Sequence, residues 1–163
     1  MTSSKILQPG AKAPEFDLKS AIDRGTRLRD FSGKPVVLVF YPADWSPVCG
    51  DELDVFNEAL PEIERSGATL VGLSVDNVWS HLAFSKSKKL RFPLLSDFEP
   101  KGKVARSYGA YEDAEGLCSR ALFLIDGNGV ISWSYLSPAG VNPGVDGVLE
   151  ALDELKSGKE GAA

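Results

Sequence analysis

The sequence predicts an α/β fold in which a mixed central β-sheet is flanked by α-helices. Residues 35–41 form an unbroken apolar run of β-branched and aromatic side chains, typical of a strand buried on both faces. Residues 52–64 follow with apolar side chains at helical spacing. Near the carboxyl end, two apolar runs flank the turn Asp-Gly-Asn-Gly at 126–129, which predicts a hairpin. Strands that alternate with helices and end in a hairpin indicate a sheet of mixed direction.

The first half of the chain is expected to supply the centre of the sheet. Its predicted elements are strands at 15–18 and 26–28, a strand at 35–41, a helix at 50–66 and a strand at 68–75. The first two strands are short and are expected to pair as an added N-terminal hairpin. Gly67 ends the helix, because glycine is the usual residue just after a last helical turn.

The second half is expected to complete the sheet and cover it. Its predicted elements are an amphipathic helix at 78–90, a strand at 92–95, a helix at 101–108 stopped by Gly109, strands at 120–125 and 130–136, and a terminal helix at 145–156. The thioredoxin-like fold is the natural assignment for this order. We expect one domain over residues 1–157, since no linker divides the chain, and a disordered tail over residues 158–163.

Composition restricts the functional classes. A net charge of −5 and a pI near 4.9 argue against partners such as nucleic acid or anionic membranes. No apolar stretch approaches the ~18 residues of a membrane span, and the first residues lack the apolar core of a secretory signal. We therefore expect a cytoplasmic protein, in a compartment where its two cysteines stay reduced.

Cys49 is the most informative residue. It lies between the buried strand at 35–41 and the helical pattern that follows, so it is expected in the first turn of a helix at the carboxyl end of a central strand. Ligands and chemistry in open α/β sheets gather at that end. A helix amino terminus has roughly half a positive charge and free N–H groups, which favour a thiolate.

A second cysteine three residues further on is the mark of a thioredoxin-type disulfide exchanger, but this chain has Glu52 there. The sequence therefore predicts a single activated cysteine. The chain contains one histidine, His81, which excludes a cluster of histidines around a metal. We expect His81 to be a surface or packing residue on its helix rather than a general base.

The pattern Pro42-x-x-x-Ser46-x-x-Cys49 resembles the peroxiredoxin active-site motif Pro-x-x-x-Thr/Ser-x-x-Cys, and Arg120 resembles the arginine that completes that site. The resemblance extends over roughly residues 9–155. Further segments match in order and spacing: 9–18, 72–76 with Ser80-His81, 92–97, and Tyr108-Gly109. Within peroxiredoxins the chain looks closest to the bacterial one-cysteine alkyl hydroperoxide reductase E type and the bacterioferritin-comigratory type.

The resemblance implies a thiol peroxidase that reduces hydrogen peroxide and organic hydroperoxides through a sulfenic acid at Cys49. Ser46 and Arg120 would donate hydrogen bonds to the transition state, and Pro42 would shield the thiolate from water. The resemblance also implies that Glu52 holds Arg120 through an ion pair. No metal, flavin, haem or other cofactor is needed, because the peroxide is the oxidant and a thiol supplies the electrons.

The expected partners are the peroxide, a thiol reductant and a second copy of the chain. The reductant would be thioredoxin, a glutaredoxin-type protein or a low-molecular-weight thiol. The resemblance implies a homodimer formed through loops around the active site, to which Trp45, Trp79 or Tyr111 would contribute apolar surface.

Cys118 leaves two mechanisms open. It stands two residues before Arg120, so in strand geometry both side chains would share a face near the site, and Cys118 would be the resolving cysteine of a two-cysteine peroxidase. Alternatively it only packs, and an external thiol recycles Cys49. A thioredoxin-fold redox sensor or a thiol–disulfide reductase is the alternative outside the peroxidases.

Overall fold

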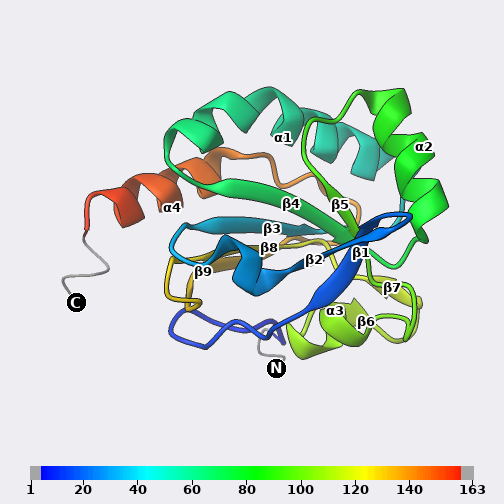
Figure 1. The fold of residues 1–163 in the computed structure, drawn as a ribbon, viewed down its shortest axis with the longest axis horizontal. Helices are drawn as coiled ribbons and strands as arrows, with labels where there is room; N and C mark the ends of the chain where they lie inside the picture. Colours follow the sequence, from blue (N-terminus) through cyan, green and yellow to red (C-terminus); the bar gives the residue numbers. More distant parts are fainter. Residues whose placement is uncertain (1–4, 159–163) are drawn as a thin grey trace.

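The computed structural model describes residues 5–158, and these form a thioredoxin-like fold with helices on both faces of a seven-stranded sheet (Figure 1). The predicted fold class is thereby confirmed. The elements are, in order, β1 (Asp17–Ala21), β2 (Arg24–Arg27), the 3-10 helix η1 (Leu28–Phe31), β3 (Val36–Phe40), α1 (Pro47–Arg65), β4 (Thr69–Ser74), α2 (Val78–Lys88), β5 (Leu94–Ser96), α3 (Lys103–Ser107), β6 (Tyr111–Glu112), β7 (Leu117–Cys118), β8 (Ala121–Ile125), β9 (Ile131–Leu136) and α4 (Asp146–Lys156). Residues 159–163 of the predicted tail lie outside the described part of the chain.

The strand order in the sheet is β2-β1-β5-β4-β3-β8-β9. β3 pairs in parallel with β4 and antiparallel with β8, so it occupies the centre, as its unbroken apolar run predicts. The N-terminal hairpin β1–β2 does form, and it extends the sheet because β1 also pairs with β5. The register places Phe40 opposite Ala121, so the end of β3 lies beside the start of β8.

Two hydrophobic clusters cover the two faces of the sheet. Because side chains alternate along a strand, Val37 and Val39 pack with α1, α2 and α4 on one face, whereas Val36, Leu38 and Phe40 pack with α3 and the N-terminal segment on the other. Figure 1 shows α1 and α2 above the sheet and α3 below it. The layered arrangement buries β3 completely.

Several boundaries differ from the sequence prediction. α1 begins at Pro47, three residues earlier than predicted, because proline suits the first helical position, where no N–H is needed. β8 begins at Ala121, so Arg120 precedes the strand instead of opening it. The small hairpin of β6 and β7 was not predicted, since strands of two residues show no alternation. No described helix is both long and apolar enough to span a membrane.

Candidate active site

Cys49 is the third residue of α1, in the first turn of the helix that follows β3. Its side chain is 0% exposed. Pro47 has no N–H, and the first turn-closing hydrogen bond runs from Gly50 N–H to Ser46 O at 2.8 Å. The amides of Val48 and Cys49 therefore stand among the N–H groups that a helix leaves without an intrahelical partner. An anion beside the Cys49 sulfur would meet these donors and the positive end of α1.

Arg120 lies directly before β8, and the pairing of Phe40 with Ala121 brings it to the end of β3, where it contacts Cys49. Arg120 Nη1 lies 3.3 Å from Cys49 Sγ and donates a second hydrogen bond of 2.9 Å to Glu52 Oε1. Glu52 comes one helical turn after Cys49, is 0% exposed and forms a buried ion pair with Arg120. The structure therefore brings the Arg120 guanidinium to a thiol and a carboxylate that lie 71 and 68 residues before it in the chain.

Burial affects the pKa values of Glu52 and Arg120 in opposite directions. It raises the pKa of Glu52 to about 7, against the opposing effect of the hydrogen bond and charge of Arg120. For Arg120 burial lowers the pKa, but the contacts with Cys49 and Glu52 outweigh it and the net direction is upward. Arg120 Nε and Glu52 Oε2 are buried and have no hydrogen-bond partner within the described chain. The guanidinium thus stays charged and keeps a donor free for a further acceptor.

Pro42 and Arg120 line a cavity of about 560 Å³. The cavity continues along apolar side chains from the β7 and β9 regions, including Leu117, Leu136 and Pro138. Cys49 is buried and does not line the cavity, whereas Arg120, which contacts the Cys49 sulfur, does. The cavity is larger than a molecule of hydrogen peroxide requires, and its apolar wall suits an alkyl group.

Ser46 is the residue at the amino-terminal cap of α1, but its side chain makes no capping hydrogen bond. It lines a different, shallower depression of about 300 Å³ together with Trp45 and Lys88. The hydroxyl is thus close to Cys49 along the helix and free of a capping bond, but no hydrogen bond joins it to the sulfur among the contacts of the described residues.

Cys118 lies at the end of β7, 1% exposed, and pairs in register with Tyr111. It belongs to the hydrophobic cluster on the α3 face of the sheet, whereas Cys49 belongs to the cluster on the α1 face. Burial raises the pKa of Cys118, and the carboxylates of Asp97 and Asp76 raise it further. Both cysteines are free. Cys118 and Arg120 line the same cavity, which agrees with the shared side that strand geometry predicts.

Sequence reasoning missed a group of polar side chains beside the site. His81 is 2% exposed and contacts Asp44, so it is a buried, hydrogen-bonded residue rather than one on the helix surface. Asp44 is 6% exposed and lies between Pro42 and Ser46. The only signal in the sequence was the position of Asp44 inside the motif, because nothing in a helical pattern marks one polar residue as buried.

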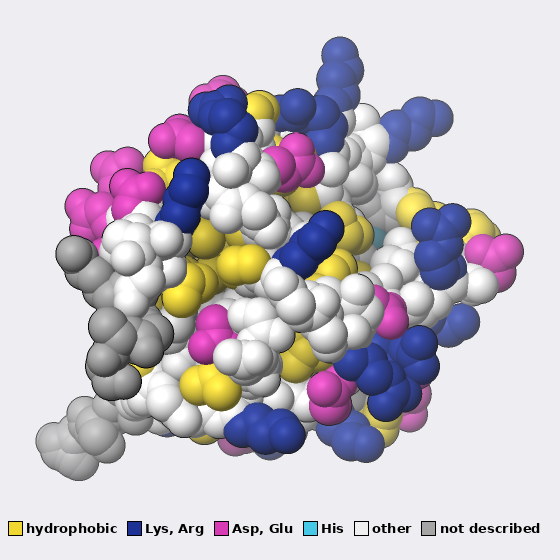
Figure 2. Space-filling model, turned by 60° about the vertical axis from the view of Figure 1, so that its left-hand side comes forward, with side chains coloured by type: hydrophobic (Ala, Val, Ile, Leu, Met, Phe, Trp, Pro, Cys, Tyr) yellow, Lys and Arg dark blue, Asp and Glu magenta, His cyan; other side chains and the backbone are white. Residues whose placement is uncertain are grey.

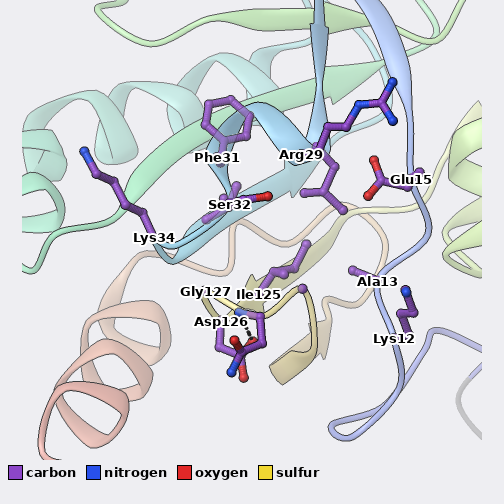
Figure 3. Close-up of a pocket in the computed structure, with 14 residues that line it drawn as sticks. Lys12, Ala13, Glu15, Arg29, Phe31, Ser32, Lys34, Ile125, Asp126 and Gly127 are labelled. Atoms are coloured by element: carbon purple, nitrogen blue, oxygen red, sulfur yellow. Dashed lines mark hydrogen bonds between the residues drawn. The ribbon is translucent and has the colours of Figure 1, made fainter.

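A separate cavity of about 140 Å³ lies at the opposite end of the sheet, where β3 begins and β8 ends (Figure 3). Its lining combines Lys12, Arg29 and Lys34 with Glu15 and Asp126 and includes no cysteine. Side chains of both charges are also interspersed on the face drawn in Figure 2. Neither this cavity nor that mixed-charge surface offers a nucleophile comparable to the Cys49 thiol at the start of α1.

Comparisons with known proteins identify similar sequences and structures. The model of the AhpC/TSA family matches residues 9–134. Peroxiredoxin Q from the chloroplast of Sedum lineare is 38% identical over 148 residues, 90% of this chain and 78% of that protein. Alkyl hydroperoxide reductase E of Mycobacterium tuberculosis is 34% identical over 136 residues, 83% of this chain and 89% of that protein. The crystal structure of peroxidoxin BcpB from Mycobacterium tuberculosis superposes with a TM-score of 0.83 at 28% identity, over 91% of this chain and 98% of the other.

Proposed function

The chain belongs to the AhpC/TSA family of peroxiredoxins and is a thiol-dependent peroxidase, and we propose that Cys49 is the thiol that attacks the peroxide. The observation that supports this assignment most directly is the hydrogen bond from Arg120 Nη1 to Cys49 Sγ, 3.3 Å long, at the amino terminus of α1. A cation and a helix amino terminus both favour a thiolate, which is the nucleophilic form of cysteine.

In the proposed first step, the Cys49 sulfur forms a bond to one peroxide oxygen while the oxygen–oxygen bond breaks. The cysteine becomes a sulfenic acid. The second oxygen leaves as hydroxide or alkoxide and takes up a proton to give water or an alcohol. Negative charge spreads over sulfur and both oxygens, so fixed donors around them lower the barrier, and each donor can raise the rate by about a hundredfold to a thousandfold. Arg120 and the amides at the start of α1 are the donors nearest to the sulfur.

The remaining residues of the site have supporting roles in this proposal. Glu52 anchors the Arg120 guanidinium at 2.9 Å and so fixes its orientation toward the sulfur. Pro42 lines the cavity, has no N–H, and in this proposal shields the thiolate from water. Ser46 would turn its unbonded hydroxyl toward the peroxide when one is present. Serine lacks the methyl group that restricts the rotamer of threonine, so this donor is the least fixed of the set.

We propose that the sulfenic acid is reduced by an external thiol, by the one-cysteine mechanism. Cys118 is a poor resolving thiol because its raised pKa keeps it protonated, and a thiolate is the attacking species in disulfide exchange. It also packs on the opposite face of the sheet from Cys49. The names of the similar proteins include two-cysteine peroxiredoxins, such as the chloroplast BAS1 protein of Hordeum vulgare, so the comparisons leave the choice to experiment.

One experiment tests both assignments. The protein is treated with one equivalent of hydrogen peroxide, and its intact mass is measured with and without thioredoxin, a glutaredoxin or a small thiol. We expect the gain of one oxygen on Cys49 and its removal by at least one of these reductants. Oxidation at Cys118 alone would reject Cys49 as the nucleophile. A loss of two hydrogens with a Cys49–Cys118 disulfide would replace the one-cysteine mechanism by the two-cysteine one.

We further propose a homodimer formed through the loops around the site. Trp45 and Trp79 support this, since they are 57% and 65% exposed and large aromatic side chains at a surface are typical of interfaces. Tyr111 is only 9% exposed and stacks under Arg106, so its predicted contribution is wrong. Sedimentation at micromolar concentration should show a dimer that Trp79→Glu weakens, with Tyr135→Glu on β9 as the control. A monomeric native protein would contradict the proposal.

A cytoplasmic location is also proposed, supported by the two free cysteines, which suit a reducing compartment. Several similar proteins are named as chloroplastic. Fractionation of cells that express the native protein would test the location, and recovery outside the cytoplasmic fraction would contradict it.

A further inference from the structure

A buried polar cluster lies beside the proposed active site and takes no direct part in the chemistry above. We call it the Asp44 cluster. Its members come from the end of β3, the segment after it, the end of β4 and the start of α2: Tyr41, Asp44, Ser74, Asp76, Ser80 and His81. Buried polar groups on this scale are stable only when each finds a partner.

The side chain of Asp44 is the hub of the cluster. Its Oδ1 accepts a hydrogen bond of 2.7 Å from the Tyr41 hydroxyl. Its Oδ2 accepts one of 2.9 Å from the Ser80 hydroxyl and lies 2.8 Å from His81 Nδ1. The backbone N–H of Asp44 donates to Asp76 Oδ2 at 2.8 Å. Asp44 is therefore held through both its side chain and its backbone.

The contacts of His81 engage both of its ring nitrogens. Nε2 lies 3.0 Å from the backbone oxygen of Leu95, and a carbonyl only accepts, so Nε2 donates this hydrogen bond. Nδ1 lies 2.8 Å from Asp44 Oδ2 and 3.5 Å from the Tyr41 hydroxyl. The buried imidazole therefore has a polar partner at each nitrogen and joins α2 to the segment after β3.

The cluster fixes a strained part of the backbone. Trp45 follows Asp44 directly and has φ +70°, in the left-handed region that bulky residues rarely adopt. Its ring contacts Phe84 of α2 edge to face, at 5.1 Å between centroids. Ser46 comes next and begins α1. Such a conformation persists only where surrounding contacts determine it, and the Asp44 cluster supplies those contacts.

We propose that Asp44 and His81 are positioning residues for the peroxidase reaction: the contact between their side chains holds residues 42–46 in the conformation that places Pro42, Ser46 and the first turn of α1 around Cys49. This inference rests on the proposed role of Cys49. A displacement of about 1 Å at a reacting group lowers a rate by about a hundredfold. Residues 42–46 include the strained backbone at Trp45, so without the contacts of the Asp44 cluster they would hold Ser46 and the start of α1 less firmly.

The ligand atoms of Asp44, Asp76 and His81 lie within 4.8 Å of one another, a spacing that a metal ion also accepts. Each of these atoms is already engaged in a hydrogen bond within the cluster. These hydrogen bonds therefore satisfy the cluster without a metal, and treatment with a chelator should leave the oxidation rate unchanged. A loss of rate with chelator that Mg²⁺ or Mn²⁺ restores would overturn the positioning role.

The test compares variants that keep or remove the hydrogen bonds. In Asp44→Asn the amide would donate to Nδ1 of a neutral His81 that still donates from Nε2 to Leu95, so the network survives without charge. We expect its rate of Cys49 oxidation by hydrogen peroxide to stay within about fivefold of wild type. Asp44→Leu and His81→Phe remove the network, and we expect losses of about 10- to 100-fold.

Two further measurements separate positioning from general destabilisation. Tyr108→Phe is the matched control, because it removes one buried hydroxyl bond, 2.7 Å to Pro14 O, on the other face of the sheet and should leave the rate unchanged. Tyr41→Phe is the milder cluster variant, with an expected loss of about two- to fivefold in the oxidation rate.

Fluorescence reports on the loop itself. In a background with Trp79→Phe and Trp133→Phe, the emission of Trp45 should shift to the red in His81→Phe while the circular dichroism stays native.

The outcomes separate this inference from the proposed function. If peroxide does not oxidise Cys49 in the wild type, the proposed function fails. If Cys49 reacts normally in the wild type and equally fast in folded Asp44→Leu, His81→Phe and Tyr41→Phe, only the positioning role fails. An Asp44→Asn variant as slow as Asp44→Leu would show that the retained hydrogen bonds do not matter and would likewise overturn it.

Discussion

Cys49 and Cys118 have nearly the same exposure, 0% and 1%, but their surroundings differ in charge. Cys49 stands in the first turn of α1 and contacts the Arg120 guanidinium. Cys118 stands in a two-residue strand, and the nearest charges that affect it are the carboxylates of Asp97 and Asp76. Under the proposed assignment, burial alone does not decide whether a thiol reacts. The sign of the neighbouring charge and the direction of the nearby backbone dipoles are the features that differ between the two sites.

The strongest test of this comparison is to remove each sulfur in turn. Cys49→Ser should abolish peroxide turnover, because serine has nearly the same shape but does not ionise at neutral pH. The measurement is peroxide consumption in the presence of an external thiol, with circular dichroism to verify the fold. If the Cys49→Ser protein retained a tenth of the wild-type turnover, the two cysteines would have to exchange their assigned roles.

The second test removes the cation that distinguishes the two sites. Arg120→Met should raise the barrier by about 3 kcal/mol or more, a loss of at least about a hundredfold in the rate of Cys49 oxidation. Stopped-flow measurement of that rate provides the readout. Arg106→Met is the matched control, since Arg106 is an arginine near the β6–β7 hairpin that stacks on Tyr111 and pairs with Asp113. Equal rates for the two variants would remove Arg120 from the chemistry.

The third test concerns the carboxylate that shares Arg120 with Cys49. Burial raises the pKa of Glu52 from 4.5 to about 7, so the folded protein binds this proton more tightly than the unfolded chain. The contribution of Glu52 to the free energy of unfolding is therefore fully present below pH 4.5 and decreases as the pH rises toward 7. The decrease is on the order of 3 kcal/mol. Glu52→Gln should flatten this dependence.

Urea denaturation of wild type and Glu52→Gln at pH 4.5, 5.5 and 7 measures the difference directly. Other carboxyl groups contribute equally to both proteins and cancel. Glu112→Gln serves as the control of opposite sign, because its hydrogen bond from Lys5 lowers the pKa of Glu112. Parallel curves for wild type and Glu52→Gln would mean that Glu52 is ionised at all three values, held so by Arg120.

The smallest expected effect is that of Cys118→Ser. The contacts that activate Cys49 do not include Cys118, so the first oxidation step should change by less than about twofold. Intact-mass measurement after stoichiometric peroxide should show the same gain of one oxygen in variant and wild type, followed by the same reduction by external thiol. Faster conversion of the variant to sulfinic acid would indicate that Cys118 normally forms a disulfide with Cys49.

The sequence predicted the order of the main strands and helices because long apolar runs and helical spacing are local signals. β3 and α1 both appear where these patterns place them, and Cys49 lies in the first turn as expected. The β6–β7 hairpin escaped prediction because its strands are too short for periodicity. The contact of Arg120 with Cys49 came from the family resemblance, since no local pattern brings together residues so far apart.

The burial of His81 could not be predicted from the sequence alone. Its burial results from the packing of α2 against β5 and β1, together with the polar partners that the segment after β3 supplies. None of these is visible in the residues next to it. The expected role of Ser46 as a donor stays a prediction. The direction of its hydroxyl depends on the left-handed turn at Trp45, a conformation that favours glycine and is not expected for tryptophan.

The pairing of β3 with β8 has a consequence for the folding chain. Arg120 reaches Cys49 only when Phe40 lies opposite Ala121, because a slip by one residue would turn the side chains of β8 to the other face of the sheet. The register of two neighbouring strands therefore joins the assembly of the sheet to the assembly of the site, because the cysteine has its guanidinium partner only in the native pairing.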